Sequence, residues 1–272
     1  MSDLQHLSME RRKYLRRLKR ERTLITVARL LMLTLILTLW EVCTRKGMLD
    51  PFIFSSPSRI VRTVISLFQT GNLLYHILYT LWETVLGFVL GTGLGVLIAV
   101  VMWWCPRVAK VFDPYLVILN SLPKIALGPV LIVWIGTGIS AIVTIAVLVS
   151  IIVCITNVST GFAGVQEEKL LLMQSFGANK LQMLHMVLLP ANVPTIISAL
   201  KLSVGLSWVG VIVGEFLISR AGLGYLIVYG GQVFKLDIVM SSVVILCTLA
   251  GVMYYGVSFL EKRITRRRLY RG

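Results

Sequence analysis

Residues that commonly form catalytic or metal sites are scarce in this sequence. It has three histidines and four cysteines, all isolated, and no CxxC or zinc-type spacing among them. Histidine clusters and paired carboxylates are likewise missing from its apolar segments. We therefore predict no disulfide, no metal site and no catalytic residue, and we do not expect an enzyme.

The sequence also lacks the P-loop pattern of Gly, any four residues, Gly, Lys and Ser or Thr. Because the backbone N–H groups of that loop hold nucleotide phosphates, we expect this chain to bind neither ATP nor Mg²⁺ itself. No cofactor is therefore predicted on this chain. Any work driven by ATP has to come from a partner.

Charged residues make up only 14% of the chain, whereas hydrophobic residues make up 57% and the mean hydropathy is +0.85. This composition is too apolar for a water-soluble globule and is typical of a membrane protein. A helix needs about 20 apolar residues to cross the hydrocarbon core. The chain of 272 residues therefore predicts an all-α membrane protein with about six transmembrane helices.

The net charge of +15 gathers at the two ends, since 14 of the 27 basic residues lie in the first 22 and last 12 positions. Basic residues beside apolar spans favour the cytoplasmic side and anionic lipid, so we expect a lipid partner and no nucleic acid. The predicted organisation is a cytoplasmic basic amphipathic segment (1–23), a single transmembrane domain (24–260) and a basic cytoplasmic tail (261–272). Both termini are expected in the cytoplasm.

Residues 164–190, called the elbow below, form a polar and amphipathic stretch between two apolar segments. Acidic residues open a first helix that should end near Phe176, because Gly177 tolerates the left-handed conformation after a last turn. Asn179 and Gln182 predict a capping box for a second helix, which should run until Pro190. The apolar face of the first helix packs on its own bundle or docks on a soluble partner. The candidate docking residues are Glu167, Glu168, Leu171, Leu172, Met173, Gly177, Ala178 and Pro190.

A glycine stripe marks the second predicted span, residues 77–104. Gly87, Gly91 and Gly95 recur every four residues, which lets another backbone approach closely. We interpret the stripe as packing within the bundle, with a seam between two copies as the alternative. Before this span, Pro57 is expected to start a surface helix.

Prolines interrupt the third apolar region, residues 111–135, at Pro123 and Pro129. Broken helices at membrane depth are tolerated only where protein or water satisfies the freed backbone groups. This region is therefore a candidate pathway element, with Asn120, Ser121 and Lys124 on it. A structural kink satisfied by neighbouring helices is the equal alternative.

The fifth span, about residues 190–218, is the least uniformly apolar. Lys201 contacts the solute or forms a structural ion pair, and the sequence leaves both open. Ser203 and Ser207 are further pathway candidates. Glu215 either caps the loop that follows, where glycines suit a tight turn, or lines an outer gate.

The spacing from Gly177 to Val187, Leu188, Leu189 and Pro190 resembles the cytoplasmic loop of permease subunits of ATP-binding-cassette importers. The likeness is to the nitrate, sulfonate, taurine and bicarbonate branch, and further matches run from about Pro57 to Leu226. The chain departs from the family's Glu-Ala-Ala, where it has Leu171, Leu172 and Met173.

The resemblance implies a type I importer permease bundle in a bacterial cytoplasmic membrane that takes up a small anionic solute. Implied partners are a second permease copy in a homodimer, two cytoplasmic ATPase subunits that bind ATP and Mg²⁺, and an extracytoplasmic substrate-binding protein. The rival interpretation is a self-sufficient secondary transporter or channel. Such carriers often show paired interrupted helices, whereas this sequence has one clear interruption.

Overall fold

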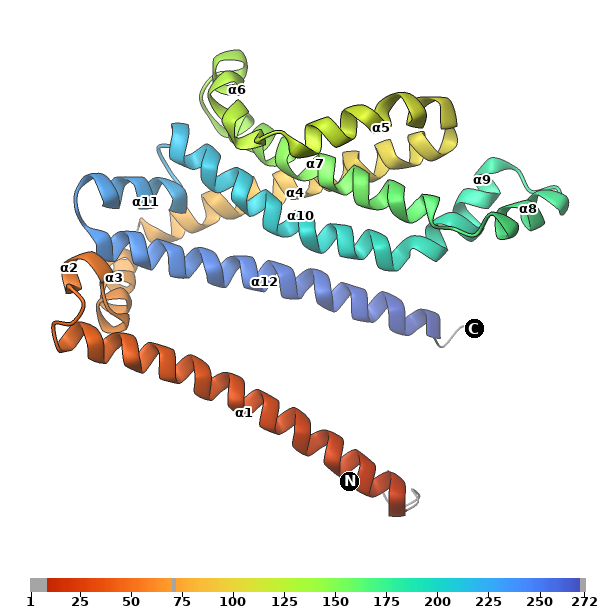
Figure 1. The fold of residues 1–272 in the computed structure, drawn as a ribbon. Coiled ribbons are helices and arrows are strands. Elements are labelled where there is room, and N and C mark those ends of the chain that lie inside the picture. Colours follow the sequence, from red (N-terminus) through yellow and green to blue (C-terminus); the bar gives the residue numbers. More distant parts are fainter. Residues whose placement is uncertain (1–8, 70–71, 270–272) are drawn as a thin grey trace. The chain divides into compact units, whose positions relative to one another are not determined.

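The computed structural model describes residues 9–69 and 72–269, and every regular element in that part of the chain is a helix (Figure 1). In the described chain five helices are long and apolar enough to span a membrane, or six if one bent pair counts as a span. The predicted all-α class with about six crossings is thus confirmed.

The chain divides into two units, Met1–Thr63 and Val64–Gly272, and each is described by itself. The elements are α1 (Met9–Arg45), α2 (Pro51–Phe54), α3 (Pro57–Gln69), α4 (Leu73–Trp104), α5 (Pro106–Ser121), η1 (Lys124–Leu127), α6 (Gly128–Ile135), α7 (Ile139–Ala163), α8 (Glu167–Ser175), α9 (Lys180–Met183), η2 (Leu184–Leu188), α10 (Leu189–Ile218), α11 (Leu223–Gln232) and α12 (Leu236–Leu269).

The predicted terminal segments are only partly described, because residues 1–8 and 270–272 lie outside the described chain. What is described of them continues without a break into α1 and α12. The boundaries expected at residues 23 and 260 therefore fall inside continuous helices. Placement of these segments on a membrane surface stays a prediction.

The first unit is built on α1, whose apolar stretch within Thr23–Arg45 has no buried residue in its most apolar window. A helix that is apolar on all sides and unburied suits a lipid surrounding. A hydrogen bond connects the C-terminal end of α1 to the first turn of α3, because Glu41 Oε2 accepts from Ser58 N at 3.0 Å. The helix predicted to begin at Pro57 is confirmed.

The second unit has α7 at its centre, packed against α4 on one side and α10 on the other. The glycine stripe of α4 makes the first contact possible. A Cβ at Gly87 would lie 2.7 Å from the Cβ of Ala146, and a Cβ at Gly95 would lie 2.7 Å from that of Cys154. The stripe therefore faces α7, which confirms packing within the bundle and not a seam between copies.

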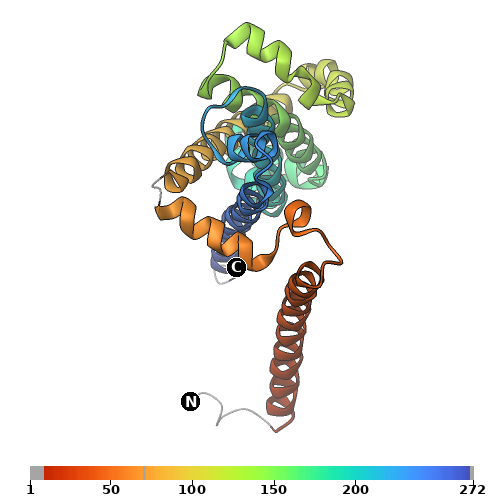
Figure 2. The same cartoon turned by 90° about the vertical axis from the view of Figure 1, so that its left-hand side faces the viewer.

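The third apolar region is a broken helix, as the prolines predict. α5 and the segment Lys124–Ile135 meet at an angle of 89°, with Leu122 and Pro123 at the break. Pro129 does not add a second break, because it lies in the first turn of α6, where no N–H donor is needed. Figures 1 and 2 place α5 and α6 on the opposite side of the bundle from α12.

The connection after α10 corrects a sequence prediction. A tight glycine loop was expected, but the chain forms the ten-residue helix α11 directly after Gly222, whose φ is +107°. Glycine there permits the left-handed conformation at the turn, and Leu223 and Leu226 then pack into a cluster with Leu73, Trp208 and Leu246. Burial of these leucines favours a helix over a short loop, a long-range effect that the local glycine pattern does not report.

Candidate elbow and cavity

The elbow folds locally much as its sequence predicts. α8 opens with Glu167 and Glu168 and ends at Ser175, followed by Gly177 with φ +81°. α9 begins with a reciprocal capping box, in which Gln182 N donates to Asn179 Oδ1 and Asn179 N donates to Gln182 Oε1, both at 2.8 Å. Two short helices joined by a left-handed glycine therefore form the corner, with Ala178 directly after it.

The second helix does not end at Pro190, contrary to the prediction. α9 passes into the π-helical turn η2 and then into α10, giving a continuous helical segment Lys180–Ile218. Pro190 lies in the first turn of α10. The wider π turn changes the hydrogen-bond register just before the proline, so the missing N–H does not stop the helix.

The apolar side chains of α8 lie on the surface of the second unit. Leu171, Leu172 and Phe176 are 56%, 57% and 78% exposed, and Met173 is partly buried. All of α8 is described, and none of its residues is buried. The elbow therefore does not use this face to pack on the described helices of its own bundle.

A hydrogen bond connects the elbow to the end of α4. Lys180 Nζ donates to the carbonyl oxygen of Trp104 at 3.2 Å. A cation at a helix C-terminus is favourable because the last carbonyl groups have no partner within the helix. The neighbouring Trp103 lines a cavity, so the elbow and the cavity share the end of α4.

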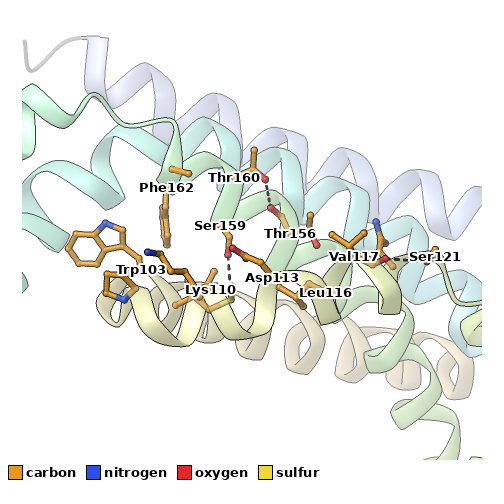
Figure 3. A pocket seen from close by; sticks show the side chains of 16 residues that line it. Trp103, Lys110, Asp113, Leu116, Val117, Ser121, Thr156, Ser159, Thr160 and Phe162 are labelled. Atoms are coloured by element: carbon orange, nitrogen blue, oxygen red, sulfur yellow. Dashed lines mark hydrogen bonds between the residues drawn. The ribbon is translucent and has the colours of Figure 1, made fainter.

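The cavity, called the α5–α7 cavity, has a volume of about 850 Å³ and lies between α5, the second half of α7 and the end of α4 (Figure 3). Its volume is large enough for a small organic solute. Apolar side chains such as Met102 and Phe162 form part of its wall. Its polar lining consists of Lys110, Asp113, Asn120, Ser121, Thr156, Ser159 and Thr160.

Lys110 and Asp113 are the charged groups of this lining, three residues apart on α5. Neither has an ion-pair partner among the residues that the structure describes. On the facing helix, Thr156 and Thr160 donate their hydroxyl hydrogens to backbone carbonyls, which leaves oxygen lone pairs toward the cavity. The cavity therefore offers both a cation and an anion to a solute, together with hydroxyl groups.

The predicted pathway residues divide into four places. Asn120 and Ser121 line the cavity, whereas Pro123 lies at the break and Lys124 follows it. Lys124 Nζ donates to Asn120 O at 3.0 Å. Lys201 pairs with Glu261 of α12 and lies 6.0 Å from the ring centroid of Tyr254. The structural ion pair, one of the two alternatives for Lys201, is thus present.

The remaining candidates, Ser203, Ser207 and Glu215, are buried in the bundle and lie outside the cavity lining. Glu215 accepts a hydrogen bond from Gly224 N at the start of α11, which confirms the capping interpretation. The prediction that paired carboxylates are missing from the spans is wrong. Glu83 of α4 lies beside Glu215 of α10, a neighbourhood that only tertiary packing creates.

Lys110, Asp113 and the hydroxyl groups of α7 were not predicted as cavity residues. Lys110 and Asp113 lie on α5 about two to three turns before the break, and the threonines lie on α7, whereas the pathway residues predicted from the sequence lie next to the break or on the fifth span. Their spacing was a usable signal, because residues three or four apart share one helix face. Lys110, Asp113, Val117 and Ser121 follow that spacing along α5, as do Thr156 and Thr160 along α7.

The family described as the binding-protein-dependent transport system inner membrane component matches residues 91–268. The chain is 28% identical to the putative aliphatic sulfonates transport permease protein SsuC of Bacillus subtilis, over 89% of this chain and 88% of that one. It is 30% identical to the formylaminopyrimidine transport permease protein ThiX of Halalkalibacterium halodurans, over 70% of this chain and 76% of that one.

Among solved structures, the fold is similar to that of a chain in a bacterial ABC transporter involved in the import of the acidic polysaccharide alginate. The TM-score is 0.64 at 17% sequence identity, over 93% of this chain and 99% of that one. The family match takes in α5, the cavity, the elbow and the last two spans. The chain therefore belongs to the family of inner membrane components of binding-protein-dependent transport systems, the membrane-spanning permease subunits of ABC importers.

Proposed function

We propose that the elbow of this permease docks on a separate cytoplasmic ATP-binding-cassette ATPase and transmits its movement to the α5–α7 cavity. The observation that carries this proposal is the apolar face of α8 and its C-cap, since Leu171, Leu172 and Phe176 are more than half exposed in the described part of the chain. Burying one such side chain stabilises an interface by about 1.5–3 kcal/mol. The candidate contact set also includes Glu167, Glu168, Met173, Gly177, Ala178 and Pro190.

Movement of the elbow has a direct route to the cavity. Lys180 holds the end of α4, and Trp103 at that end lines the cavity. In this mechanism ATP and Mg²⁺ bind to two ATPase subunits, whose closure draws two elbows together. The bundle then exchanges between two arrangements that expose the cavity to opposite sides of the membrane.

We propose that a second copy of the chain covers the exposed apolar side chains of α5 and α6. Val117, Val133 and Trp134 are 70%, 83% and 76% exposed there. The break at Leu122 and Pro123 lies on the same segment and frees backbone groups that lipid cannot satisfy. A homodimer would enclose this break and place the two cavities on either side of one pathway.

We infer that the cargo is a small solute with an anionic group, delivered by an extracytoplasmic substrate-binding protein. The relative SsuC is named for aliphatic sulfonates, and Lys110 supplies to the cavity an ammonium group without an ion-pair partner among the described residues. Asn120 and Ser121 are proposed pathway contacts on the same wall. Pro123, Lys124, Lys201, Ser203, Ser207 and Glu215 are proposed to support the pathway by shaping the helices around it.

The proposed orientation puts the elbow end of the bundle in the cytoplasm of a bacterial cell, with both termini on that side. The C-terminal end of α12 carries Lys262 and Arg263. Basic residues at span ends favour the cytoplasmic face. α11 would then face the outer compartment, where a binding protein docks.

The test is co-purification in mild detergent of the full chain with its ATPase, identified by mass spectrometry and by ATP hydrolysis. Replacing Leu171 and Leu172 by aspartate should reduce the bound ATPase at least tenfold, because the charges would have to be desolvated at the contact. Met48→Asp is the matched control, since Met48 is 73% exposed and lies outside the elbow.

Loss of the ATPase in both variants would contradict docking at the elbow, as would retention in both. Reconstitution separates the rival mechanism: uptake by this chain alone in liposomes, driven by an ion gradient, would refute the need for an ATPase. Uptake that requires ATP and the binding protein supports the proposal.

A further inference from the structure

Two carboxyl groups lie together inside the membrane-spanning bundle of the second unit. Glu83 of α4 is 0% exposed and Glu215 of α10 is 1% exposed, and they interact electrostatically. Thr80, one turn before Glu83, is also fully buried. An ionised side chain buried in a membrane-spanning bundle costs free energy unless hydrogen bonds stabilise its charge. The hydrogen bonds of the two carboxyl groups therefore indicate which of them is ionised.

Glu215 receives a donor on each of its oxygens. Thr80 Oγ1 donates to Glu215 Oε1 at 2.6 Å, and Gly224 N donates to Glu215 Oε2 at 2.5 Å. Thr80 Oγ1 also accepts a hydrogen bond from Leu223 N at 2.7 Å, and Glu215 Oε1 is the acceptor of its hydroxyl hydrogen. Donors on both oxygens match the ionised form of a carboxyl group, which only accepts.

Glu83 has the opposite surroundings. Neither of its oxygens accepts a hydrogen bond from the N–H and O–H donors of the residues that the structure describes, and its polar neighbour is the carboxyl group of Glu215. An ionised carboxylate in this place would be unsolvated and next to the negative charge of Glu215. Two adjacent buried carboxylates do not both stay ionised, since each disfavours the charge of the other.

We propose that Glu83 and Glu215 form a binding site for one proton, which Glu83 carries and donates to the Glu215 carboxylate. The pair then has a single negative charge. Glu215 distributes this charge over Thr80 and the backbone N–H of Gly224, and thereby fixes the start of α11. The site holds α4, α10 and α11 together at the end of the bundle opposite the elbow (Figure 1).

No basic side chain neutralises the pair in the described chain. The titratable groups that face it are His76 and Tyr79 on α4 and Tyr225 on α11. His76 Nδ1 accepts a hydrogen bond from Gly222 N at 3.0 Å, so this nitrogen carries no proton and the ring adds no positive charge. The phenol groups of Tyr79 and Tyr225 supply no positive charge in either protonation state.

Two glycines show how closely the backbone approaches this site. A Cβ at Gly224 would lie 2.6 Å from Glu215 Oε2, and a Cβ at Gly222 would overlap the same carboxyl group. Both positions therefore let the first turn of α11 reach Glu215. If Glu83 lost its proton, two charges would repel at this turn, and α11 would be released from α4 and α10.

Infrared spectroscopy of the full chain in lipid nanodiscs tests the proton directly. At neutral pH the wild type should show the carbonyl stretch of a protonated carboxylic acid, and Glu83→Gln should lose it. Glu41→Gln is the matched control and should keep it, because Glu41 is ionised by its bond to Arg45 Nε at 2.7 Å. A wild type without this band, or a band that persists in Glu83→Gln, overturns the proposal.

Hydrogen exchange of α11 tests what the proton does. Glutamine at position 83 can donate as the protonated acid does, so Glu83→Gln should keep α11 protected. Glu215→Gln should lower the protection tenfold or more, because its NH₂ group replaces one acceptor and faces a donor. After correction for intrinsic exchange, wild-type protection should fall at alkaline pH while Glu83→Gln does not change. Equal loss in both variants, or a pH response that survives in Glu83→Gln, would assign the pair a packing role only.

Discussion

The glycine stripe of α4 allows a test in which the chain supplies its own control. Gly87→Ala adds a methyl group at the contact with α7, 2.7 Å from the Cβ of Ala146. Gly93→Ala adds the same group six residues later on the same helix, where nothing lies within 4 Å. Both changes remove the same backbone flexibility, so their difference isolates the helix–helix contact.

The magnitude follows from the distances. Apolar carbon atoms pack best at about 3.5–4.0 Å, so the new contact at Gly87 is short by roughly 1 Å and α4 has to move away from α7. Overpacking of this kind costs about 1–3 kcal/mol. Alanine in place of glycine contributes roughly 0.5–1 kcal/mol of helix propensity at both positions. We expect Gly93→Ala to be as stable as the wild type or more so, and Gly87→Ala to be about 1–3 kcal/mol less stable than Gly93→Ala.

The assay is denaturation of the full chain in detergent micelles, followed by tryptophan fluorescence, with the free energies of unfolding compared at one temperature. Ala146→Gly supplies the rescue, because the next nearest atoms to a Cβ at Gly87 lie 3.9 Å away. The double variant Gly87→Ala with Ala146→Gly should show a favourable coupling energy. Equal stability of the two alanine variants, or the absence of coupling to Ala146, would refute the packing assignment.

Two further predictions concern charged side chains. Lys201→Met and Glu261→Gln should each destabilise the bundle, because each leaves a partly buried charged group without its ion-pair partner. A double-mutant cycle in the same denaturation assay should give a coupling energy of about 0.5–3 kcal/mol. Additive effects would mean that the ion pair contributes nothing to stability. Lys110→Gln should lower ATP-dependent uptake of an anionic solute into proteoliposomes at least severalfold while ATPase binding stays unchanged, because Lys110 supplies positive charge to the cavity lining. Unchanged uptake would remove Lys110 from the pathway.

Local structure was predictable where a few neighbouring residues decide it. The left-handed turn at Gly177 and the Asn179–Gln182 capping box depend on backbone conformation and on hydrogen bonds over three residues, and both are confirmed. The break near Pro123 is predictable for the same reason, since proline removes a donor wherever it stands. Pro190 was misjudged because a π turn, set by the packing of Leu184 and Leu188, compensates for it.

The sequence by itself determined that this chain is a multi-span helical protein with one helical elbow, because hydropathy and turn chemistry act over short distances. Only the tertiary structure decided which side chains meet. In it the glycine stripe faces α7, Lys201 pairs with Glu261, and Glu83 lies beside Glu215. Lys110 and Asp113 line the same cavity as the hydroxyl groups of α7. Residues far apart in the chain come together through helix packing, which follows from the shapes of whole helix faces and not from any local pattern.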